Sequence, residues 1–153
     1  MKTAYLYIRV STDEQAIKGY SQRSQLDRLT RYCIVRDVSI WDTIFEDYSA
    51  KTFNRPGWLA MMARIRRNKR SRPNLILFTK WDRFSRNAGD AYYMITQLRN
   101  LDIQPQAIDQ ELDFAVPENK IILGVYLATS EAENDRRSLN VKQGIHKAKK
   151  EGR

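Results

Sequence analysis

The chain has 153 residues and a mass of 18.0 kDa, enough for one domain with a hydrophobic core and too little for two ordinary domains. Hydrophobic residues make up 42% of it and charged residues 29%, which excludes disordered, collagen-like and low-complexity classes. The net charge of +9 favours a polyanionic partner such as nucleic acid, although merely soluble basic proteins have the same balance. Apolar runs fall short of the roughly 20 residues of a membrane span and no signal peptide opens the chain, so we expect a cytoplasmic protein.

Strand and helix patterns alternate along the chain. A buried strand is predicted over residues 3–10, then a polar loop over 11–19 and a helix over 20–36. A strand over 39–46, a helix beginning at Pro56, a strand over 74–80 and a helix over 87–101 follow. A fourth strand is predicted over 106–109, and a fifth if residues 112–114 also pair. This alternation predicts an α/β fold with an open, mostly parallel sheet of four or five strands.

The last predicted helix begins at Pro117 and, if unbroken to about Glu151, is about 50 Å long, whereas a small domain is about 30 Å across. It would project from an α/β core over 1–117 as a long helix over 118–153. Its first half is apolar around most of its circumference, and because a sheet covers only one side, the other side predicts contact with a second copy. The alternative is a core helix that breaks near Gly144. The candidate interface residues are Ile122, Val125, Tyr126 and Thr129.

Few residues offer metal or hydrolase chemistry. The single cysteine, Cys33, excludes an internal disulfide and is interpreted as a small buried hydrophobe, and one histidine, His146, excludes a histidine-rich metal site. Phosphate-binding glycine loops and the G-x-S-x-G elbow are missing from the sequence. Three alternating carboxylates could face a Mg²⁺ ion, although a solvated turn is the more ordinary interpretation; they are Asp109, Glu111 and Asp113.

Basic residues are concentrated in two blocks. Residues 61–90 hold nine basic and two acidic side chains, and residues 134–153 hold seven and two, so the rest of the chain is slightly acidic. Each block is either a solvated helix face or part of a surface that follows phosphates.

Several of the candidate site residues follow predicted strands, where open parallel sheets bind ligands. Arg9 and Ser11 are two residues apart, and so project from the same face of the first strand. Residues 80–86 follow the third predicted strand and carry a carboxylate and two guanidiniums, which converge if a helix begins there. Arg55 precedes a proline at a helix entrance and is expected to point off its loop. Guanidiniums suit the charge that builds when a serine attacks a phosphodiester, and no metal is then needed.

These motifs resemble those of the serine site-specific recombinases, a family of resolvases, invertases and large serine integrases. Residues 7–15, YIRVSTDEQ, resemble the nucleophile motif, and Ser21 with Gln25 resembles the S-x-x-x-Q segment. Residues 54–57, NRPG, resemble the arginine loop, and residues 81–86, WDRFSR, resemble L-D-R-x-x-R. Residues 131–133 resemble the A-E stretch of the long last helix. The similarity therefore extends over nearly the whole chain.

The resemblance implies that Ser11 attacks the scissile phosphate of double-stranded DNA, forms a 5′-phosphoserine link and releases a 3′-hydroxyl, without a cofactor, metal or ATP. Asp82 would protonate the leaving oxygen and Gln25 would support the site. The arginines expected around the phosphate are Arg9, Arg55, Arg83 and Arg86. The family exchanges strands in a tetramer of two dimers joined through the long helix. The residues expected over the DNA minor groove are Arg136, Arg137, Lys142, Lys147, Lys149 and Lys150.

Two departures from the family pattern qualify this expectation. Smaller members carry helix arginines at the places held here by Asn134 and Asn140. No helix-turn-helix or zinc ribbon follows the motifs, so we expect a catalytic-domain fragment of a larger recombinase. The alternatives are a catalytically silent DNA-binding or oligomerisation module of the same fold and a metal-dependent nuclease.

Overall fold

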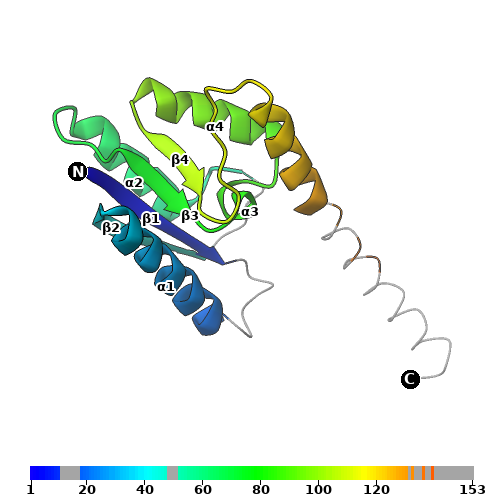
Figure 1. The fold of residues 1–153 in the computed structure, drawn as a ribbon, viewed down its shortest axis with the longest axis horizontal. Helices are drawn as coiled ribbons and strands as arrows, with labels where there is room; N and C mark the ends of the chain where they lie inside the picture. Colours follow the sequence, from blue (N-terminus) through cyan, green and yellow to red (C-terminus); the bar gives the residue numbers. More distant parts are fainter. Residues whose placement is uncertain (11–17, 48–51, 131, 133–135, 137–138, 140–153) are drawn as a thin grey trace.

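The structure is a computed structural model that describes residues 1–10, 18–47, 52–130, 132, 136 and 139 (Figure 1). Its elements, in chain order, are β1 (Lys2–Val10), α1 (Lys18–Arg36), β2 (Val38–Asp47), α2 (Pro56–Arg67), β3 (Leu75–Phe78), α3 (Trp81–Phe84), α4 (Ala88–Asn100) and β4 (Gln104–Ala107). A last helix follows over residues 119–130, and residues 132, 136 and 139 are also helical.

The four strands form one parallel sheet in the order β2-β1-β3-β4, which confirms the predicted fold class. β1 lies at the centre and pairs with β2 over its whole length, with a bulge that admits Trp41 between the partners of Ala4 and Tyr5. The strand order reverses between β1 and β3. In open α/β sheets such a reversal leaves a crevice beyond the carboxyl ends of the two strands, where ligands bind.

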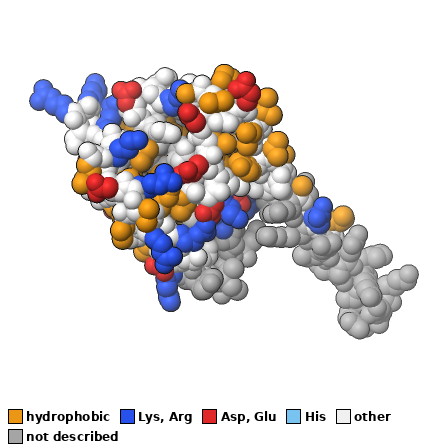
Figure 2. Space-filling model, viewed as in Figure 1, with side chains coloured by type: hydrophobic (Ala, Val, Ile, Leu, Met, Phe, Trp, Pro, Cys, Tyr) orange, Lys and Arg blue, Asp and Glu red, His pale blue; other side chains and the backbone are white. Residues whose placement is uncertain are grey.

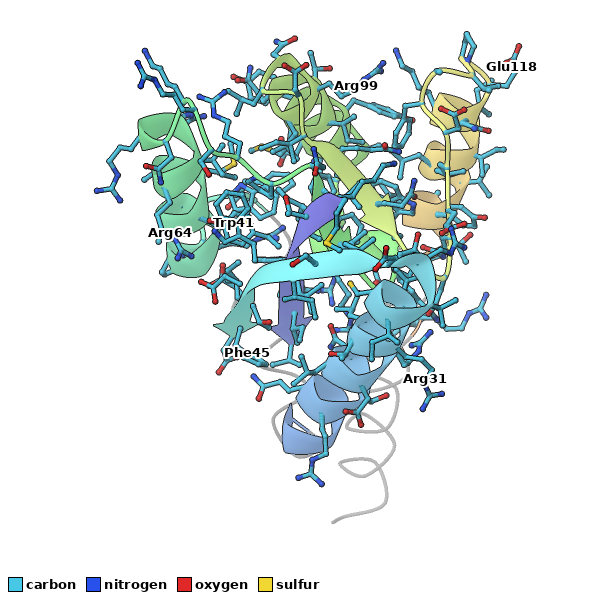
Figure 3. The ribbon with its side chains drawn as sticks, turned by 60° about the vertical axis from the view of Figure 1, so that its left-hand side comes forward. Arg31, Trp41, Phe45, Arg64, Arg99 and Glu118 are labelled. Atoms are coloured by element: carbon cyan, nitrogen blue, oxygen red, sulfur yellow. The ribbon has the colours of Figure 1, made fainter. Side chains whose placement is uncertain are left out.

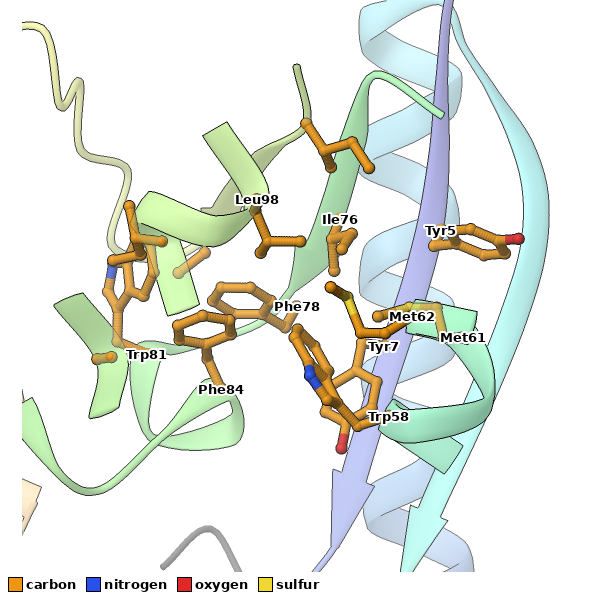
Figure 4. Packing of buried hydrophobic residues seen from close by; sticks show 14 of the residues in the cluster. Tyr5, Tyr7, Trp58, Met61, Met62, Ile76, Phe78, Trp81, Phe84 and Leu98 are labelled. Atoms are coloured by element: carbon orange, nitrogen blue, oxygen red, sulfur yellow. The ribbon is translucent and has the colours of Figure 1, made fainter. Parts of the chain in front are cut away.

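Side chains of β1 alternate between two hydrophobic layers, as a strand covered on both faces requires. Ala4, Leu6 and Ile8 pack with Cys33 under α1, which confirms that the cysteine is a buried hydrophobe. Tyr5 and Tyr7 point to the other face, where α2, α3, α4 and the last helix build the larger core (Figure 4). The aromatic centre of that core consists of Tyr7, Trp58, Phe78, Trp81 and Phe84.

Of the two predicted strand numbers, four is the one observed in the described residues, since the optional fifth strand at residues 112–114 is irregular. The buried side chain of Gln106 explains why: its Nε2 donates to the Leu112 carbonyl at 2.8 Å and its Oε1 accepts from the Leu112 N–H at 2.9 Å. A side-chain amide thus provides the bonds that a neighbouring strand would have made. β4 also begins earlier than predicted and includes Pro105, which is tolerated because β4 is an edge strand.

The last helix begins at residue 119, two positions after the predicted Pro117, and lies beside α4 (Figure 1). Leu123 and Leu127 are buried in the larger core, whereas Ile121 and Val125 are 70% and 59% exposed. Figure 2 shows hydrophobic side chains gathered on the side where α4 and this helix lie. The helix is therefore apolar on both its packed and its open side. Its predicted continuation to Glu151 and the alternative break near Gly144 lie outside the described residues.

Within the described part of the chain, none of the helices combines the length and the hydropathy that a membrane crossing requires.

The basic block over residues 61–90 is divided between the two ends of the sheet, rather than forming one surface. α2 runs antiparallel to the strands, so the exposed and mostly basic residues 66–70, at its end and just after it, lie at the amino-terminal edge, where Asn74 meets Thr3. Arg64 is one turn back; it pairs with Asp42 and lies over the ring of Tyr5, which stacks on Trp41 (Figure 3). The basic residues of 80–86 follow β3 and lie at the opposite, carboxyl edge.

Candidate active site

The candidate site lies beyond the carboxyl ends of β1 and β3, where the strand order reverses. β1 ends at Val10, and the predicted nucleophile, Ser11, is the next residue and lies outside the described residues. The described part of the site therefore consists of the side chains that surround this strand end.

Arg9 is completely buried and joins β1 to the turn of α3. Its Nη2 donates to the Asp82 carbonyl at 3.0 Å and its Nε to the Arg83 carbonyl at 3.2 Å. In return, Arg83 Nη1 and Gln25 Nε2 each donate to the Arg9 carbonyl at 3.2 Å, and the same Gln25 nitrogen reaches the hydroxyl of Ser21. These reciprocal bonds hold the end of β1, the first turns of α1 and the single turn of α3 together.

Four guanidiniums are grouped at this position. Burial is the largest cause that lowers the pKa of Arg9, followed by the positive charges of Arg55, Arg83 and Arg86, and together they lower it to about 10. Like charges placed this close in a poorly hydrated site repel one another, and an anion bound among them relieves that repulsion. The structure thus brings together the four arginines that the sequence predicts near a phosphate.

Arg55 does not point off its loop as predicted but is completely buried. Its Nε donates to the Thr52 carbonyl at 2.9 Å, its Nη1 to the Tyr7 hydroxyl at 3.2 Å and its Nη2 to the Phe84 carbonyl at 2.6 Å. The guanidinium also lies over the ring of Phe53, 4.6 Å from the centroid. Extended geometry before Pro56 is present, with φ −119° and ψ 134°, but it aims the side chain inward.

Tyr7 and Glu46 belong to the site, and sequence reasoning missed both. The Tyr7 hydroxyl donates to Glu46 Oε1 at 3.0 Å while it accepts from Arg55, and burial raises the pKa of this phenol above its ordinary value. Glu46, at the end of β2, is 4% exposed and accepts two backbone N–H bonds from the start of α2. The sequence held a signal for Tyr7, which precedes Arg9 by two residues and so lies on the same face of the strand. It held no local signal that Glu46 would be a neighbour of Tyr7.

Asp82 and Arg86 come from α3 and the residues after it. The helix has one turn and ends at Phe84, since Ser85 is extended, so the helical spacing expected between them does not exist. Asp82 Oδ1 and Arg86 Nε are nevertheless buried, and neither has a hydrogen-bond partner within the described residues. Leaving a polar atom buried in this way costs about 1–3 kcal/mol, and a catalytic role or a bound ion is one of the reasons for which native structures accept that cost.

The three alternating carboxylates are each bound to other protein groups. Asp109 pairs with Arg28, Glu111 accepts from the Tyr32 hydroxyl at 2.6 Å, and Asp113 accepts from the backbone of residue 115. Across residues 1–10, 18–47, 52–130, 132, 136 and 139, no group of three or more histidine, cysteine or acidic side chains is arranged to hold a metal ion. The metal-dependent nuclease therefore lacks a candidate site in this part of the chain.

The residues predicted to contact partners lie on the last helix. Ile122, Val125 and Thr129 are exposed, as an interface with a second copy requires, whereas Tyr126 is half-buried and packs partly against the larger core. Arg136 is helical and exposed. The other predicted DNA contacts and the two departures lie outside the described residues; they are Arg137, Lys142, Lys147, Lys149, Lys150, Asn134 and Asn140.

A parallel α/β sheet with guanidiniums grouped beyond its central strands is typical of an anion-binding domain. The family model for "Resolvase, N terminal domain" matches residues 4–153. The chain therefore belongs to this family, the N-terminal catalytic domains of serine recombinases.

Solved structures agree with this assignment. The N-terminal catalytic domain of TP901-1 integrase is 25% identical, with a TM-score of 0.66 over 88% of this chain and 98% of that one. A resolvase family site-specific recombinase from Streptococcus pneumoniae is 26% identical, with a TM-score of 0.64 over 97% and 99% of the two chains.

The chain is also similar in sequence to a phage protein. The uncharacterized immunity region protein 3 of Bacillus phage phi105 is 41% identical over 68 residues, which are 42% of this chain and 79% of the phage protein.

Proposed function

We propose that this chain is a DNA recombinase catalytic domain that cleaves and rejoins double-stranded DNA through a phosphoserine at Ser11. The observation that carries the proposal is the buried guanidinium of Arg9, with three further guanidiniums close enough to lower its pKa. A site of this kind favours a group with multiple negative charges, and the phosphorus of a phosphodiester gains negative charge when it is attacked. The same proposal divides the chain into a catalytic core over residues 1–117 and a long helix over residues 118–153. It also takes the chain to be a fragment of a larger recombinase.

In the proposed reaction a bond forms between Ser11 Oγ and the scissile phosphorus, and the bond from phosphorus to the 3′-oxygen breaks. The serine hydroxyl gives its proton to water, and the leaving 3′-oxygen takes a proton for which Asp82 is the candidate donor. Arg9, Arg83 and Arg86 would stabilise the charge on the five-coordinate phosphorus, and Arg55 would add its positive charge to theirs. Attack of the 3′-hydroxyl on the phosphoserine reverses these bond changes and rejoins the DNA without a metal ion or ATP.

The exposed apolar side of the last helix supports self-association to a dimer and then a tetramer. Ile121 and Val125 expose large apolar side chains on a helix whose other side is already buried in the core. Burial of this side against a second copy removes apolar surface from water, which is the main favourable term in most protein association. The basic residues farther along the same helix would then lie over the DNA.

A trapping experiment tests the proposal and identifies the target sequence at the same time. The full-length protein is incubated with a fragment library of its source genome in excess EDTA, and DNA ends linked covalently to protein are isolated and sequenced. We expect 5′-linked protein from the wild type and from a control, Ser39→Ala, in an exposed serine of β2, and none from Ser11→Ala. Cleavage that stops in EDTA would instead favour a metal-dependent nuclease, and DNA binding without any covalent product would favour the silent module.

A further inference from the structure

A buried hydrogen-bond relay runs from the start of α2 through Glu46 and Tyr7 to Arg55. We propose that Glu46 is a positioning residue, which sets the place of the Arg55 guanidinium through the Tyr7 phenol. The effect on catalysis rests on the proposed function, whereas the effect on Arg55 itself does not. Every member of this Glu46–Tyr7–Arg55 relay is buried, at 4% exposure or less.

The direction of each bond in the relay is determined by the chemistry of Glu46. Oε2 accepts from the Gly57 N–H at 2.9 Å, and Oε1 accepts from the Trp58 N–H at 2.9 Å and from the Tyr7 hydroxyl at 3.0 Å. An ionised carboxylate only accepts, so the single phenol proton of Tyr7 points toward Glu46. The lone pairs of the phenol oxygen are then free to accept the Nη1 proton of Arg55 at 3.2 Å.

The bond to Tyr7 links Arg55 to the strand that leads to the nucleophile. The other two described bonds of Arg55 go to backbone carbonyls, at Thr52 in its own loop and at Phe84 in α3. Tyr7 lies on β1, two residues before Arg9 and on the same face. Loss of the phenol contact therefore releases the guanidinium from β1 while its attachment to the loop and to α3 remains.

The start of α2 is shaped to receive this carboxylate. Pro56 occupies the first helical position, where the missing N–H costs nothing, and the next two N–H groups bind Glu46. A Cβ atom at Gly57 would lie 2.9 Å from Oε2, so any other residue here would displace the carboxylate from its present place. The positive end of the helix dipole adds to the attraction for a negative charge at this position.

A glutamine cannot replace the carboxylate in the relay. All three groups that face Glu46 are donors, so an amide nitrogen at either oxygen position meets an N–H or an O–H directly. If that nitrogen faces Tyr7, the phenol must accept from it and turn its own proton toward Arg55, where two donors then oppose each other. If the nitrogen faces the Gly57 N–H instead, the two donors repel each other and move the amide away from the start of α2, and with it the oxygen that accepts the phenol proton. Glu46→Gln is therefore nearly unchanged in shape but disturbs the bond that holds Arg55 in either orientation.

The test compares Tyr7→Phe, Glu46→Gln and the double variant with two matched controls. Tyr5→Phe alters a buried tyrosine on the same face of β1 that stacks on Trp41, and Asp42→Asn alters a carboxylate on β2 that pairs with Arg64. Tyr7→Phe keeps the carboxylate bonds to α2, and so keeps the proposal testable if Glu46→Gln does not fold.

The first measurement is independent of catalysis: the NMR signal of the buried Arg55 Nε–H in the 153-residue chain, assigned by its loss in Arg55→Lys. We expect this signal to shift and its hydrogen exchange to accelerate in both relay variants and in neither control. An unchanged Arg55 signal in folded Tyr7→Phe overturns the proposal. This measurement decides the relay even if the wild type forms no covalent complex with DNA, a result that would count only against the proposed function.

The second measurement is the single-turnover rate of covalent complex formation on a DNA fragment recovered by trapping. Loss of one hydrogen bond to a charged group predicts a rate about ten- to a hundredfold lower in each relay variant. DNA affinity should change less than about twofold, because the bond positions a group rather than holding the duplex. The double variant should be no slower than the slower single variant, since both act through one bond. Multiplied losses in the double variant would show that Glu46 and Tyr7 act separately, and would overturn the relay.

Discussion

Gly57→Ala is predicted to destabilise the protein, which is the reverse of the usual effect of such a change in a helix. Alanine normally stabilises a helix interior by about 1 kcal/mol relative to glycine, because the backbone loses less entropy on folding. Here the new Cβ would lie 2.9 Å from Glu46 Oε2, closer than real Cβ contacts come, and 3.0 Å from Oε1, which is tight. The carboxylate must therefore move away from the start of α2.

The size of the effect follows from the bonds that this movement breaks. Glu46 accepts from the N–H groups of Gly57 and Trp58, each at 2.9 Å. Hydrogen bonds to a charged group contribute about 1.5–3 kcal/mol each, so the loss of one or both outweighs the gain in helix propensity. We expect a net loss of about 1–3 kcal/mol, which lowers the melting temperature by roughly 2–4 °C for each kcal/mol in a domain of this size.

Urea unfolding followed by tryptophan fluorescence measures the change, from the midpoint and slope of the transition. Gly89→Ala is the matched control, since Gly89 holds the same second helical position in α4 and its added Cβ would meet only Asn87 Oδ1, at 3.3 Å. In a Glu46→Ala background the clash is absent, so Gly57→Ala should stabilise by up to about 1 kcal/mol. If Gly57→Ala stabilises the wild type as well, the carboxylate is not held at the helix start and the reasoning fails.

The remaining predictions concern packing, self-association, ionisation and capping. Leu127→Ala should lower the free energy of unfolding by about 2–5 kcal/mol because the side chain is 1% exposed. Val125→Asp, at a position 59% exposed, should leave monomer stability nearly unchanged but weaken self-association in sedimentation, and unaltered association would contradict the interface. Burial and the bond to Glu111 raise the pKa of Tyr32 to about 12, so its stabilising bond is present below about pH 10 and is lost as the pH rises toward 12. In an ultraviolet titration, Tyr32→Phe should lack one phenol ionisation that the wild type shows near pH 12. Equal numbers of ionisations there in the two proteins would contradict this. Asn87→Ala should cost about 1 kcal/mol in urea unfolding, since the side chain accepts the N–H three residues on at the start of α4.

Much of the fold could be predicted from local pattern. The apolar run of β1, the proline at the start of α2 and the alternation of strands with helices are each properties of neighbouring residues, and the parallel sheet follows from them. The optional fifth strand shows the limit: residues 112–114 resemble a strand, but the Gln106 side chain already binds the backbone there. No pattern within the segment itself contains that information.

The candidate site shows the same division. Sequence motifs single out the arginines, and the ends of two neighbouring parallel strands necessarily meet at one edge of the sheet. Their orientation could not be predicted: Arg55 turns inward because the Tyr7 phenol and the Phe84 carbonyl are there to accept its protons. The placement of Glu46 beside Arg9 depends on the register between β1 and β2, and the sequence of one strand alone does not determine that register.

The sequence by itself thus determined the family, the order of the elements and which cations lie near the strand ends, because these depend on residue type and spacing along the chain. Only the tertiary structure decided which basic residues share a surface, which side of the last helix stays open, and that a carboxylate from the edge strand reaches the arginine loop through a phenol. Such contacts join residues tens of positions apart, and they form only when strand order, register and helix direction are all set.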